Sequence, residues 1–349
     1  MKYNYPELNQ LIGKNQIQKK IYQATSFWKQ ASREIIAAIE KSGIENFRNL
    51  DAALGYFVPN YGIPANSFDE ITEKRITALL KSKGTHKQSL AMSEFLSGYF
   101  HALADYRVFI SSDNTAKRPI LSDFSESGYG NPTEQFEFSG KKYSRSALNY
   151  LLGLCFLKKH MDDNDKLDTV LEIGGGFGTL GEILKFSAGT RYINIDIPPT
   201  SFISWTYLSN IYIDSVIESC VHDKKTIDIS ELGPCSVFNS WDIEKLEGEI
   251  DLFVNFISFQ EMEPDVVENY LKHVKRLHPK YILLRNMREG KQAKKVSTDV
   301  GVETPIMKSD YIKMIEGSYS LIATNVFPFG YKTVDGFHSE LLLFRRSHE

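Results

Sequence analysis

From residue 168 to the C-terminus, apolar runs typical of β-strands alternate with segments of helical periodicity. The strand candidates are TVLEI, RYINI, CSVFN, DLFVNFI, YILLR, YSLIATNVF and ELLLFRR. Such alternation predicts an α/β fold, a parallel sheet with helices on both faces. The last two strand candidates have no helix between them, so they should pair antiparallel. We therefore expect a Rossmann-like, doubly wound sheet of seven strands in which only the last strand is reversed.

The first 110 residues differ, because their apolar residues recur at helical spacing. SFWKQASREIIAAIEKSG and KQSLAMSEFLSGYFHALADYRVF each predict a helix, and residues 111–135, rich in Ser, Gly, Pro and Asn, predict a loop. Aromatic residues such as Phe27, Trp28 and Tyr56 are core by default, but some can cover a bound ligand. We expect a mostly helical cap or substrate region over residues 1–140 and a sheet domain over residues 141–349.

Composition disfavours several classes of protein. The formal net charge is −3 and no long basic run occurs, which disfavours nucleic-acid binding. We find neither a run of about 18 apolar residues nor a signal-peptide core, so we expect no membrane span and a cytoplasmic protein. The histidines and cysteines form no zinc motif. We expect no bound metal, although Glu261, Glu263 and Asp265 are an acidic run of a kind that can bind Mg²⁺.

Four glycines lie within five positions of VLEIGGGFGTL, directly after the first strand candidate. Ligands bind outside the carboxyl ends of parallel strands, so this loop is a candidate ligand contact. Gly176, Gly178 and Gly181 match the dinucleotide pattern G-x-G-x-x-G. A second register, E-x-G-x-G-x-G, begins at Glu172 and runs through Gly174.

Position and charge favour the second register. A dinucleotide pattern should begin where the strand ends, at Gly174, but the pattern started there fails at Thr179. The Glu172 carboxylate would repel a pyrophosphate, and it would suit the sulfonium and ammonium groups of S-adenosylmethionine. Bare amides at a helix N-terminus can still receive the carboxylate of that cofactor.

Two further strand ends carry candidate ligand contacts. Asp196 ends the second strand candidate and can accept hydrogen bonds from both hydroxyls of a ribose, a role that suits NAD equally well. Trp241 and Asp242 follow the third strand and are placed to meet an adenine ring. Taken singly, Asp196 could be a helix cap and Trp241 core packing. Their positions on successive strand ends favour a shared ligand site.

VLEIGGGFGTLGEIL followed by YINIDIPP resembles the class I S-adenosylmethionine-dependent methyltransferases. SFWKQ, GIENFRN, ALADYRVF, SGYGNPTEQFEF, YSRSALNYLLGL and FISFQEMEP resemble the bacterial sugar O-methyltransferases, from about residue 26 to the last strand. The resemblance implies methyl transfer to a sugar hydroxyl of a surface polysaccharide or glycoconjugate precursor, and it leaves a homo-oligomer open. The expected cofactor contacts are Glu172, Gly174, Gly175, Gly176, Gly178, Asp196, Trp241, Asp242 and Asn255.

A catalytic base cannot be copied from plant-type O-methyltransferases, because Gln260 stands about where their histidine lies. A sugar hydroxyl is a poor nucleophile until its proton is taken. The loops after the fourth and sixth strands offer Glu261 and His338 as candidate bases. Histidine titrates close to neutrality, whereas a glutamate would need a raised pKa. Arg285, on the fifth strand, is a candidate for binding an anionic group of the acceptor.

Other functions stay open. An NAD-dependent oxidoreductase acting on a nucleotide sugar would also use a glycine loop, but Glu172 and the lack of a Y-x-x-x-K motif count against it. A methyltransferase acting on a non-sugar hydroxyl is a second alternative. The third is a cofactor-binding protein that only scaffolds a partner.

Overall fold

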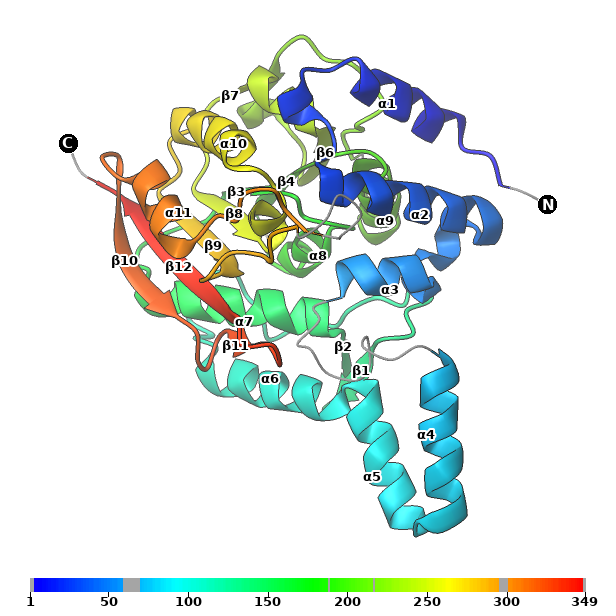
Figure 1. The fold of residues 1–349 in the computed structure, drawn as a ribbon. Helices are drawn as coiled ribbons and strands as arrows, with labels where there is room; N and C mark the ends of the chain where they lie inside the picture. Colours follow the sequence, from blue (N-terminus) through cyan, green and yellow to red (C-terminus); the bar gives the residue numbers. More distant parts are fainter. Residues whose placement is uncertain (1–2, 59–69, 188, 216, 295–300, 348–349) are drawn as a thin grey trace.

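The computed structural model describes residues 3–58, 70–187, 189–215, 217–294 and 301–347. The strand order of its central sheet is β10 (Tyr319–Asn325), β12 (His338–Arg346), β9 (Tyr281–Met287), β8 (Leu252–Phe256), β3 (Thr169–Ile173), β4 (Arg191–Asp196) and β6 (Cys235–Asn239) (Figure 1). Neighbouring strands pair parallel except at β12, which is antiparallel to both β9 and β10. The predicted α/β, doubly wound fold with a reversed last strand is confirmed. A short strand, β11 (Tyr331–Lys332), adds to β12.

Side chains of the central strands alternate between two apolar clusters, one on each face of the sheet. Val170 and Val254 belong to one cluster, and Leu171 and Phe253 belong to the other. Helices α7 (Arg145–His160), α8 (Thr179–Lys185) and α9 (Thr200–Ile211) contribute to the first cluster, and α10 (Pro264–Arg276) and α11 (Lys308–Ile315) to the second. The strands are thus buried on both faces, as continuous apolar runs in parallel strands predict.

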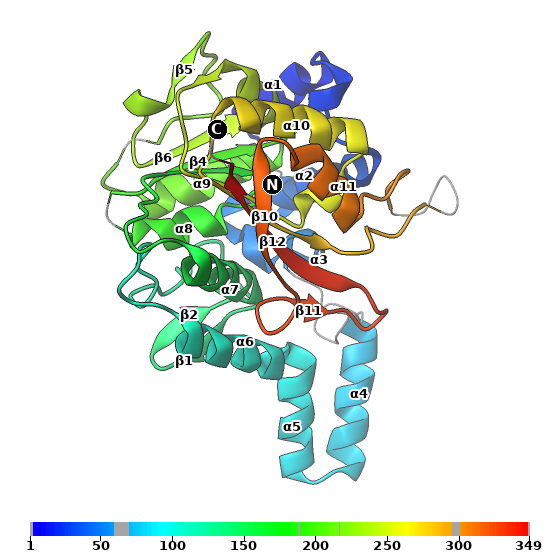
Figure 2. The ribbon, with the colours of Figure 1, turned by 90° about the vertical axis from the view of Figure 1, so that its left-hand side faces the viewer.

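The N-terminal region is helical and packs on the first cluster through Leu8, Ile35 and Phe47. Its helices are α1 (Pro6–Gln16), α2 (Ser26–Ser42), α3 (Asp51–Phe57), α4 (Glu70–Lys83), α5 (His86–Ser97) and α6 (Tyr99–Ser112), with short 3₁₀ turns η1 (Lys20–Tyr22) and η2 (Ile44–Asn49). Helices α4 and α5 form a hairpin that projects from the body of the molecule (Figures 1 and 2). The division of the chain at residue 140 stays a prediction.

Two predicted helices have different bounds in the structure. The helix expected over residues 87–109 is divided at Gly98, which has φ +83°, and a side chain there would come within 3.2 Å of the Arg145 guanidinium. The segment SFISWTYLSNIYIDSVI, residues 201–217, also predicts a single helix, but α9 ends at Ile211. Tyr212 turns back into the core and donates its hydroxyl to the Gly181 carbonyl at 2.8 Å.

Several short elements connect the main ones. They are the hairpin β1 (Phe136–Phe138) and β2 (Lys141–Tyr143), the parallel pair β5 (Ile227–Asp228) and β7 (Leu246–Glu247), and the 3₁₀ turns η4 (Ile229–Glu231), η5 (Ser240–Lys245) and η6 (Ser258–Glu261). Within the described part of the chain, no helix is both long and apolar enough to cross a bilayer.

The contact between α7 and β8 can be tested at Gly153. A side chain at this glycine would come within 2.3 Å of the Phe256 ring, which stacks on Tyr150 at 4.9 Å. Overpacking therefore predicts that Gly153→Ala lowers the free energy of unfolding by about 1–3 kcal/mol in urea denaturation. Gly13→Ala is the control, because no atom lies within 4 Å of that position in α1. The control should be neutral or slightly stabilising, and equal losses in both variants would contradict the close packing.

Candidate functional site

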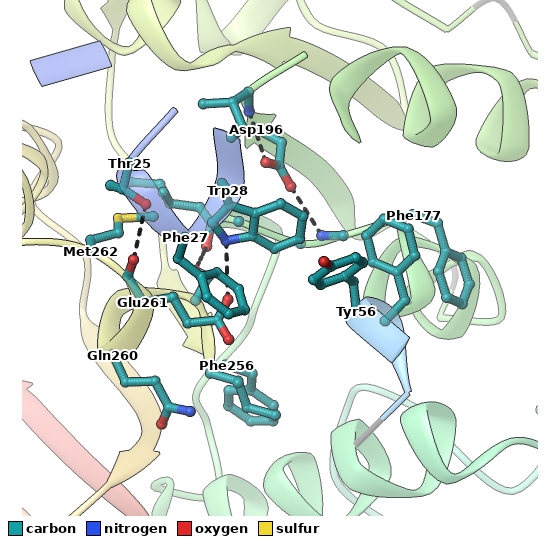
Figure 3. A pocket seen from close by; sticks show the side chains of 18 of the residues that line it. Thr25, Phe27, Trp28, Tyr56, Phe177, Asp196, Phe256, Gln260, Glu261 and Met262 are labelled. Atoms are coloured by element: carbon teal, nitrogen blue, oxygen red, sulfur yellow. Dashed lines mark hydrogen bonds between the residues drawn. The ribbon is translucent and has the colours of Figure 1, made fainter. Parts of the chain in front are cut away.

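A cavity of about 250 Å³ lies at the carboxyl ends of the parallel strands (Figure 3). The sheet side of its lining includes the glycine loop after β3, Asp196 after β4, and Gln260 and Glu261 in η6 after β8. The N-terminal region supplies Thr25, Phe27, Trp28, Tyr56 and Phe57. The helical region thus covers the edge of the sheet where a doubly wound fold binds its ligand.

The glycine loop presents bare backbone to this cavity. Gly174, Gly175 and Gly176 line it, and Gly174 and Gly176 have left-handed φ values of +72° and +60°. A side chain at Gly174 would come within 2.1 Å of the Ser258 hydroxyl. The Gly176 amide donates a hydrogen bond to Asp196 Oδ2 at 3.1 Å. Glycine is therefore required for the left-handed conformation and for the close contact of the loop with Ser258.

The other two glycines of the motif serve packing between elements. A side chain at Gly178 would come within 2.7 Å of Leu208, and one at Gly181 within 2.6 Å of the Tyr192 ring. Neither glycine lines the cavity. The predicted cofactor contact at Gly178 therefore lies outside the lining, because α8 must pack closely on α9 and β4.

Glu172 lies behind the loop, with no exposed surface. Its two carboxyl oxygens accept hydrogen bonds from the hydroxyls of Tyr150 and Tyr192, both at 2.6 Å. Burial raises the pKa of the Glu172 carboxyl to about 7, and the two tyrosine hydrogen bonds oppose that rise. The sequence predicts a carboxylate that faces the ligand. The structure instead turns it into the protein, where two hydroxyls satisfy it.

Asp196 does line the cavity. Its Oδ1 accepts a hydrogen bond from the Ile197 amide at 2.7 Å, and its Oδ2 accepts one from Gly176. Burial raises the pKa of Asp196 to about 8, although these two backbone hydrogen bonds lower it. Each oxygen keeps further acceptor capacity, so the group can receive hydroxyl donors from a ligand.

Three other predicted cofactor contacts lie outside the lining. Trp241 packs in the apolar cluster beneath α10. Asp242 accepts a hydrogen bond from the Asn239 amide at 3.0 Å and pairs with Lys245 at 2.7 Å, so it caps η5. Asn255 donates to the Ile173 carbonyl at 2.9 Å and to the Ser258 hydroxyl at 2.6 Å. In these positions the three side chains hold the strand ends instead of facing the cavity.

Glu261 joins three separate segments at the cavity (Figure 3). Its Oε2 accepts a hydrogen bond from Trp28 Nε1 at 3.0 Å, and its carbonyl accepts one from the Thr25 hydroxyl at 3.1 Å. Its Oε1 accepts a hydrogen bond from Lys291 Nζ at 2.6 Å, and that ammonium lies 3.7 Å from the centre of the Phe27 ring. The sequence gave no signal for the partners Thr25 and Lys291.

The other two residues expected in the active site lie elsewhere. His338 begins β12 and lies outside the cavity lining. Its Nδ1 is 2.6 Å from Oε1 of Glu289. Arg285 is fully buried and donates to the carbonyls of Asn149 at 3.1 Å and Phe329 at 2.7 Å. Of the two candidate bases, only Glu261 lines the cavity. Arg285 is turned away from it because the guanidinium satisfies backbone carbonyls.

A strained residue precedes η6. Ile257 has φ +72° and ψ −34°, an outlier for a β-branched side chain. Its amide donates to the Arg285 carbonyl at 2.7 Å, and the residue lines the cavity. Such strain clusters at functional sites. No sequence signal marks this turn, because isoleucine is disfavoured in it.

The acidic run after β8 does not converge on one point. Glu263 accepts hydrogen bonds from the amides of Glu303 and Thr304, both at 3.0 Å, and Asp265 is exposed. Among the described residues, no group of three or more His, Cys, Asp or Glu side chains is placed to hold a metal ion.

No family model and no curated protein matches the chain. Among solved structures, the chain is similar to magnesium protoporphyrin IX methyltransferase from Synechocystis PCC 6803, crystallised with S-adenosylmethionine (15% identity, 58% of this chain, 81% of that chain, TM-score 0.38). It is also similar to mitomycin 7-O-methyltransferase (14% identity, 58% of this chain, 55% of that chain, TM-score 0.37). A third similar structure is an O-methyltransferase of neocarzinostatin biosynthesis in complex with S-adenosylhomocysteine and 1,4-dihydroxy-2-naphthoic acid (10% identity, 51% of this chain, 49% of that chain, TM-score 0.35). These likenesses are distant, and we assign the fold from the strand order of this chain.

The environment of Glu172 predicts a pH-dependent stability. Between its ordinary pKa of 4.5 and its folded value of about 7, the unfolded chain loses this proton and the folded chain keeps it. Stability from this group is therefore complete below about pH 4.5 and falls by about 1.4 kcal/mol per pH unit up to about pH 7. Glu172→Gln cannot ionise, so the wild-type protein should lose up to roughly 3 kcal/mol relative to the variant across this window.

Urea denaturation of both proteins between about pH 5 and 8 measures this difference. Glu268→Gln, at an exposed position on α10, is the control and should follow the wild-type protein. A wild-type minus Glu172→Gln difference that does not change with pH would contradict a protonated Glu172.

Proposed function

We propose that this protein is a cytoplasmic S-adenosylmethionine-dependent O-methyltransferase acting on a sugar hydroxyl, in a precursor of a surface polysaccharide or glycoconjugate. The observation that carries the proposal is the cavity edge formed by the bare loop at residues 174–176 and the Asp196 carboxylate, joined by the Gly176 hydrogen bond. The family resemblance of the sequence motifs supports the same function.

Sheet topology favours this reading over an NAD-dependent oxidoreductase. The dinucleotide fold has six strands in the order 3-2-1-4-5-6. Here the antiparallel strand β12 is inserted between β9 and β10. In addition, Gly178 and Gly181, which complete the dinucleotide pattern, pack against Leu208 and Tyr192.

The residues present fit S-adenosylmethionine. Asp196 would accept hydrogen bonds from the ribose hydroxyls, and the amides of the loop would receive the carboxylate of the methionine part. The rings of Trp28, Tyr56 and Phe57 line the same cavity, and aromatic faces attract cationic groups. When bound, the cofactor supplies a methyl group on positively charged sulfur.

Glu261 is the base in this proposal. It is the carboxylate at the β8 end of the cavity, and the Trp28 indole holds its Oε2 in place. Lys291 pairs with Oε1 at 2.6 Å and orients the carboxylate. Glu261 would accept the hydroxyl proton of the acceptor, and the acceptor oxygen would take the methyl group that the bound cofactor supplies, with S-adenosylhomocysteine as the leaving group. Trp28, Tyr56 and Phe57 line the cavity, which supports our proposal that residues 1–140 act as a cap.

Cofactor binding is the first prediction from this proposal. Calorimetric titration of the wild-type protein should show binding of S-adenosylhomocysteine and no binding of NAD⁺. Asp196→Ala removes the hydrogen-bond acceptor for the ribose, so it should weaken binding of S-adenosylhomocysteine about tenfold or more, which is roughly 1.4 kcal/mol of binding free energy. Asp214→Ala, at an exposed position after α9, should leave affinity unchanged. Binding of NAD⁺ alone would reject the methyltransferase in favour of the oxidoreductase.

Removal of the base is the second prediction. Glu261→Gln keeps the shape of the side chain but cannot accept the proton, so kcat for methyl transfer to a sugar acceptor should fall about 10²–10⁴-fold. Affinity for S-adenosylhomocysteine should stay within about twofold of wild type, because the change affects the acceptor side. His338→Asn and Glu268→Gln are controls that should keep full activity. Full activity of Glu261→Gln would remove Glu261 as the base.

A further inference from the structure

Asn149 lies at the cavity with a buried side-chain oxygen that has no hydrogen-bond partner among the described residues. The residue lies on α7, is 2% exposed and lines the cavity. Its Oδ1 is fully buried and accepts no hydrogen bond within the described residues. An unpaired buried amide costs about 1–3 kcal/mol. A protein that retains such a group at a cavity wall gains from it only when a ligand supplies the partner.

Gln260 presents a second unused amide to the same cavity. It is 4% exposed, and its Oε1 accepts the Met287 amide at 2.7 Å, which fixes the orientation of the side chain. With the oxygen held in this way, the Nε2 donor is left without a partner among the described residues. Figure 3 shows the nitrogen end of Gln260 directed toward Phe256. One N–H donor group is therefore available here.

Both amides lie around β9, at the opposite end of the cavity from Asp196. Gln260 bonds to Met287 of β9, and the Asn149 carbonyl accepts a hydrogen bond from Arg285 of the same strand. The sheet order places β8 and β3 between β9 and β4, on which Asp196 lies. The two amides are thus separated from Asp196, where the ribose of the cofactor is expected.

This end of the cavity carries no unpaired charge in the part of the chain that is described. The acidic and basic residues among the described lining are Asp196, whose pKa burial raises to about 8, and Glu261 and Lys291. Lys291 is paired with Glu261, and Asp196 lies at the other end. Phe256 adds an apolar ring face beside the amides. The Arg285 guanidinium lies behind this end of the cavity, outside the lining, and donates to the carbonyls of Asn149 and Phe329. An anionic acceptor ring would therefore lose its hydration here without direct contact with that cation.

We propose that Asn149 and Gln260 are specificity-determining residues that bind a neutral, polyhydroxylated acceptor ring at the β9 end of the cavity. This inference rests on the proposed function, and it narrows the acceptor from sugars in general to uncharged ones. The Asn149 amide supplies an acceptor oxygen, and Gln260 Nε2 supplies a donor. A sugar hydroxyl can donate a hydrogen bond to Asn149 Oδ1, and an adjacent hydroxyl can accept one from Gln260 Nε2. The apolar face of the sugar ring can pack on the Phe256 ring.

The test uses full-length protein saturated with S-adenosylhomocysteine. Saturation-transfer NMR measures binding of methyl α-D-glucopyranoside, methyl α-D-galactopyranoside and methyl α-L-rhamnopyranoside. Glucuronic acid and glucose 6-phosphate are the anionic probes, and catechol is the planar phenol. At least one neutral glycoside should bind, and the anionic probes and catechol should bind at least about tenfold more weakly.

Two near-isosteric variants separate binding from folding. Asn149→Leu replaces the unpaired side-chain oxygen with an apolar group, so it should raise the Tm of the free protein. The same variant should weaken binding of the glycoside about tenfold, because it removes the acceptor. Gln260→Glu keeps the acceptor for the Met287 amide and replaces the donor with an oxygen, so it should weaken the glycoside similarly. Affinity for S-adenosylhomocysteine should stay within about twofold in both. Asn210→Ala, on the outer face of α9, is the control and should change none of these values.

Several results would overturn the inference and leave the cofactor assignment intact. They are binding of S-adenosylhomocysteine without binding of any neutral glycoside, equal binding of an anionic probe or catechol, and a lower Tm of Asn149→Leu with unchanged glycoside affinity. A tenfold loss of S-adenosylhomocysteine affinity in Asn149→Leu would instead assign Asn149 to the cofactor. Failure of the wild-type protein to bind S-adenosylhomocysteine would remove the proposed function itself.

Discussion

The carboxyl group of Glu172, held between the hydroxyls of Tyr150 and Tyr192, is the interaction on which the rest of the site depends. It joins α7, β3 and β4 directly beneath the glycine loop. Each partner is buried, so the three side chains exclude water and fix one another. The loop can then adopt its left-handed turns over a rigid base. Tyr150 also stacks on Phe256 at 4.9 Å, which carries this rigidity to the β8 side of the cavity.

A second junction, at Glu261, closes the cavity from above. Chain connectivity alone does not hold the N-terminal helices over the strand ends, so non-covalent contacts must do so. The hydrogen bonds from Trp28 and Thr25 and the ion pair with Lys291 bring three distant parts of the chain together at one carboxylate. The same group that we propose as the base therefore also holds the cover in place. A substitution of Glu261 therefore removes the proton acceptor and also loosens the contact with the N-terminal helices. Affinity for S-adenosylhomocysteine, measured together with the rate of methyl transfer, separates the two effects.

Asn149 Oδ1 and Gln260 Nε2 differ from most polar atoms of the site in having no hydrogen-bond partner among the described residues. Most buried polar groups at this edge of the sheet are paired, as for Asn255 with the Ile173 carbonyl. A protein would normally pair or replace an unsatisfied amide, because burial without a partner lowers stability. Their retention beside a cavity is what a binding surface for a hydroxylated ligand requires. The ends of the cavity thus have different chemistry, with a carboxylate and backbone amides at β4 and neutral side-chain amides at β9.

The sequence by itself determined the α/β fold class with its reversed last strand, and it predicted the edge of the sheet at which the candidate site lies. Continuous apolar runs can be buried only in a sheet covered on both faces, and glycines directly after the first strand mark the edge where backbone is exposed. Local patterns also placed Asp196 and Glu261 near the cavity. Tertiary structure decided which polar groups face the ligand. Glu172 and Arg285 are turned inward because partners far away in the sequence satisfy them, whereas Asp242 caps η5 through the amide of Asn239, three residues earlier. Trp28, Lys291 and Asn149 enter the site through packing that no local spacing encodes.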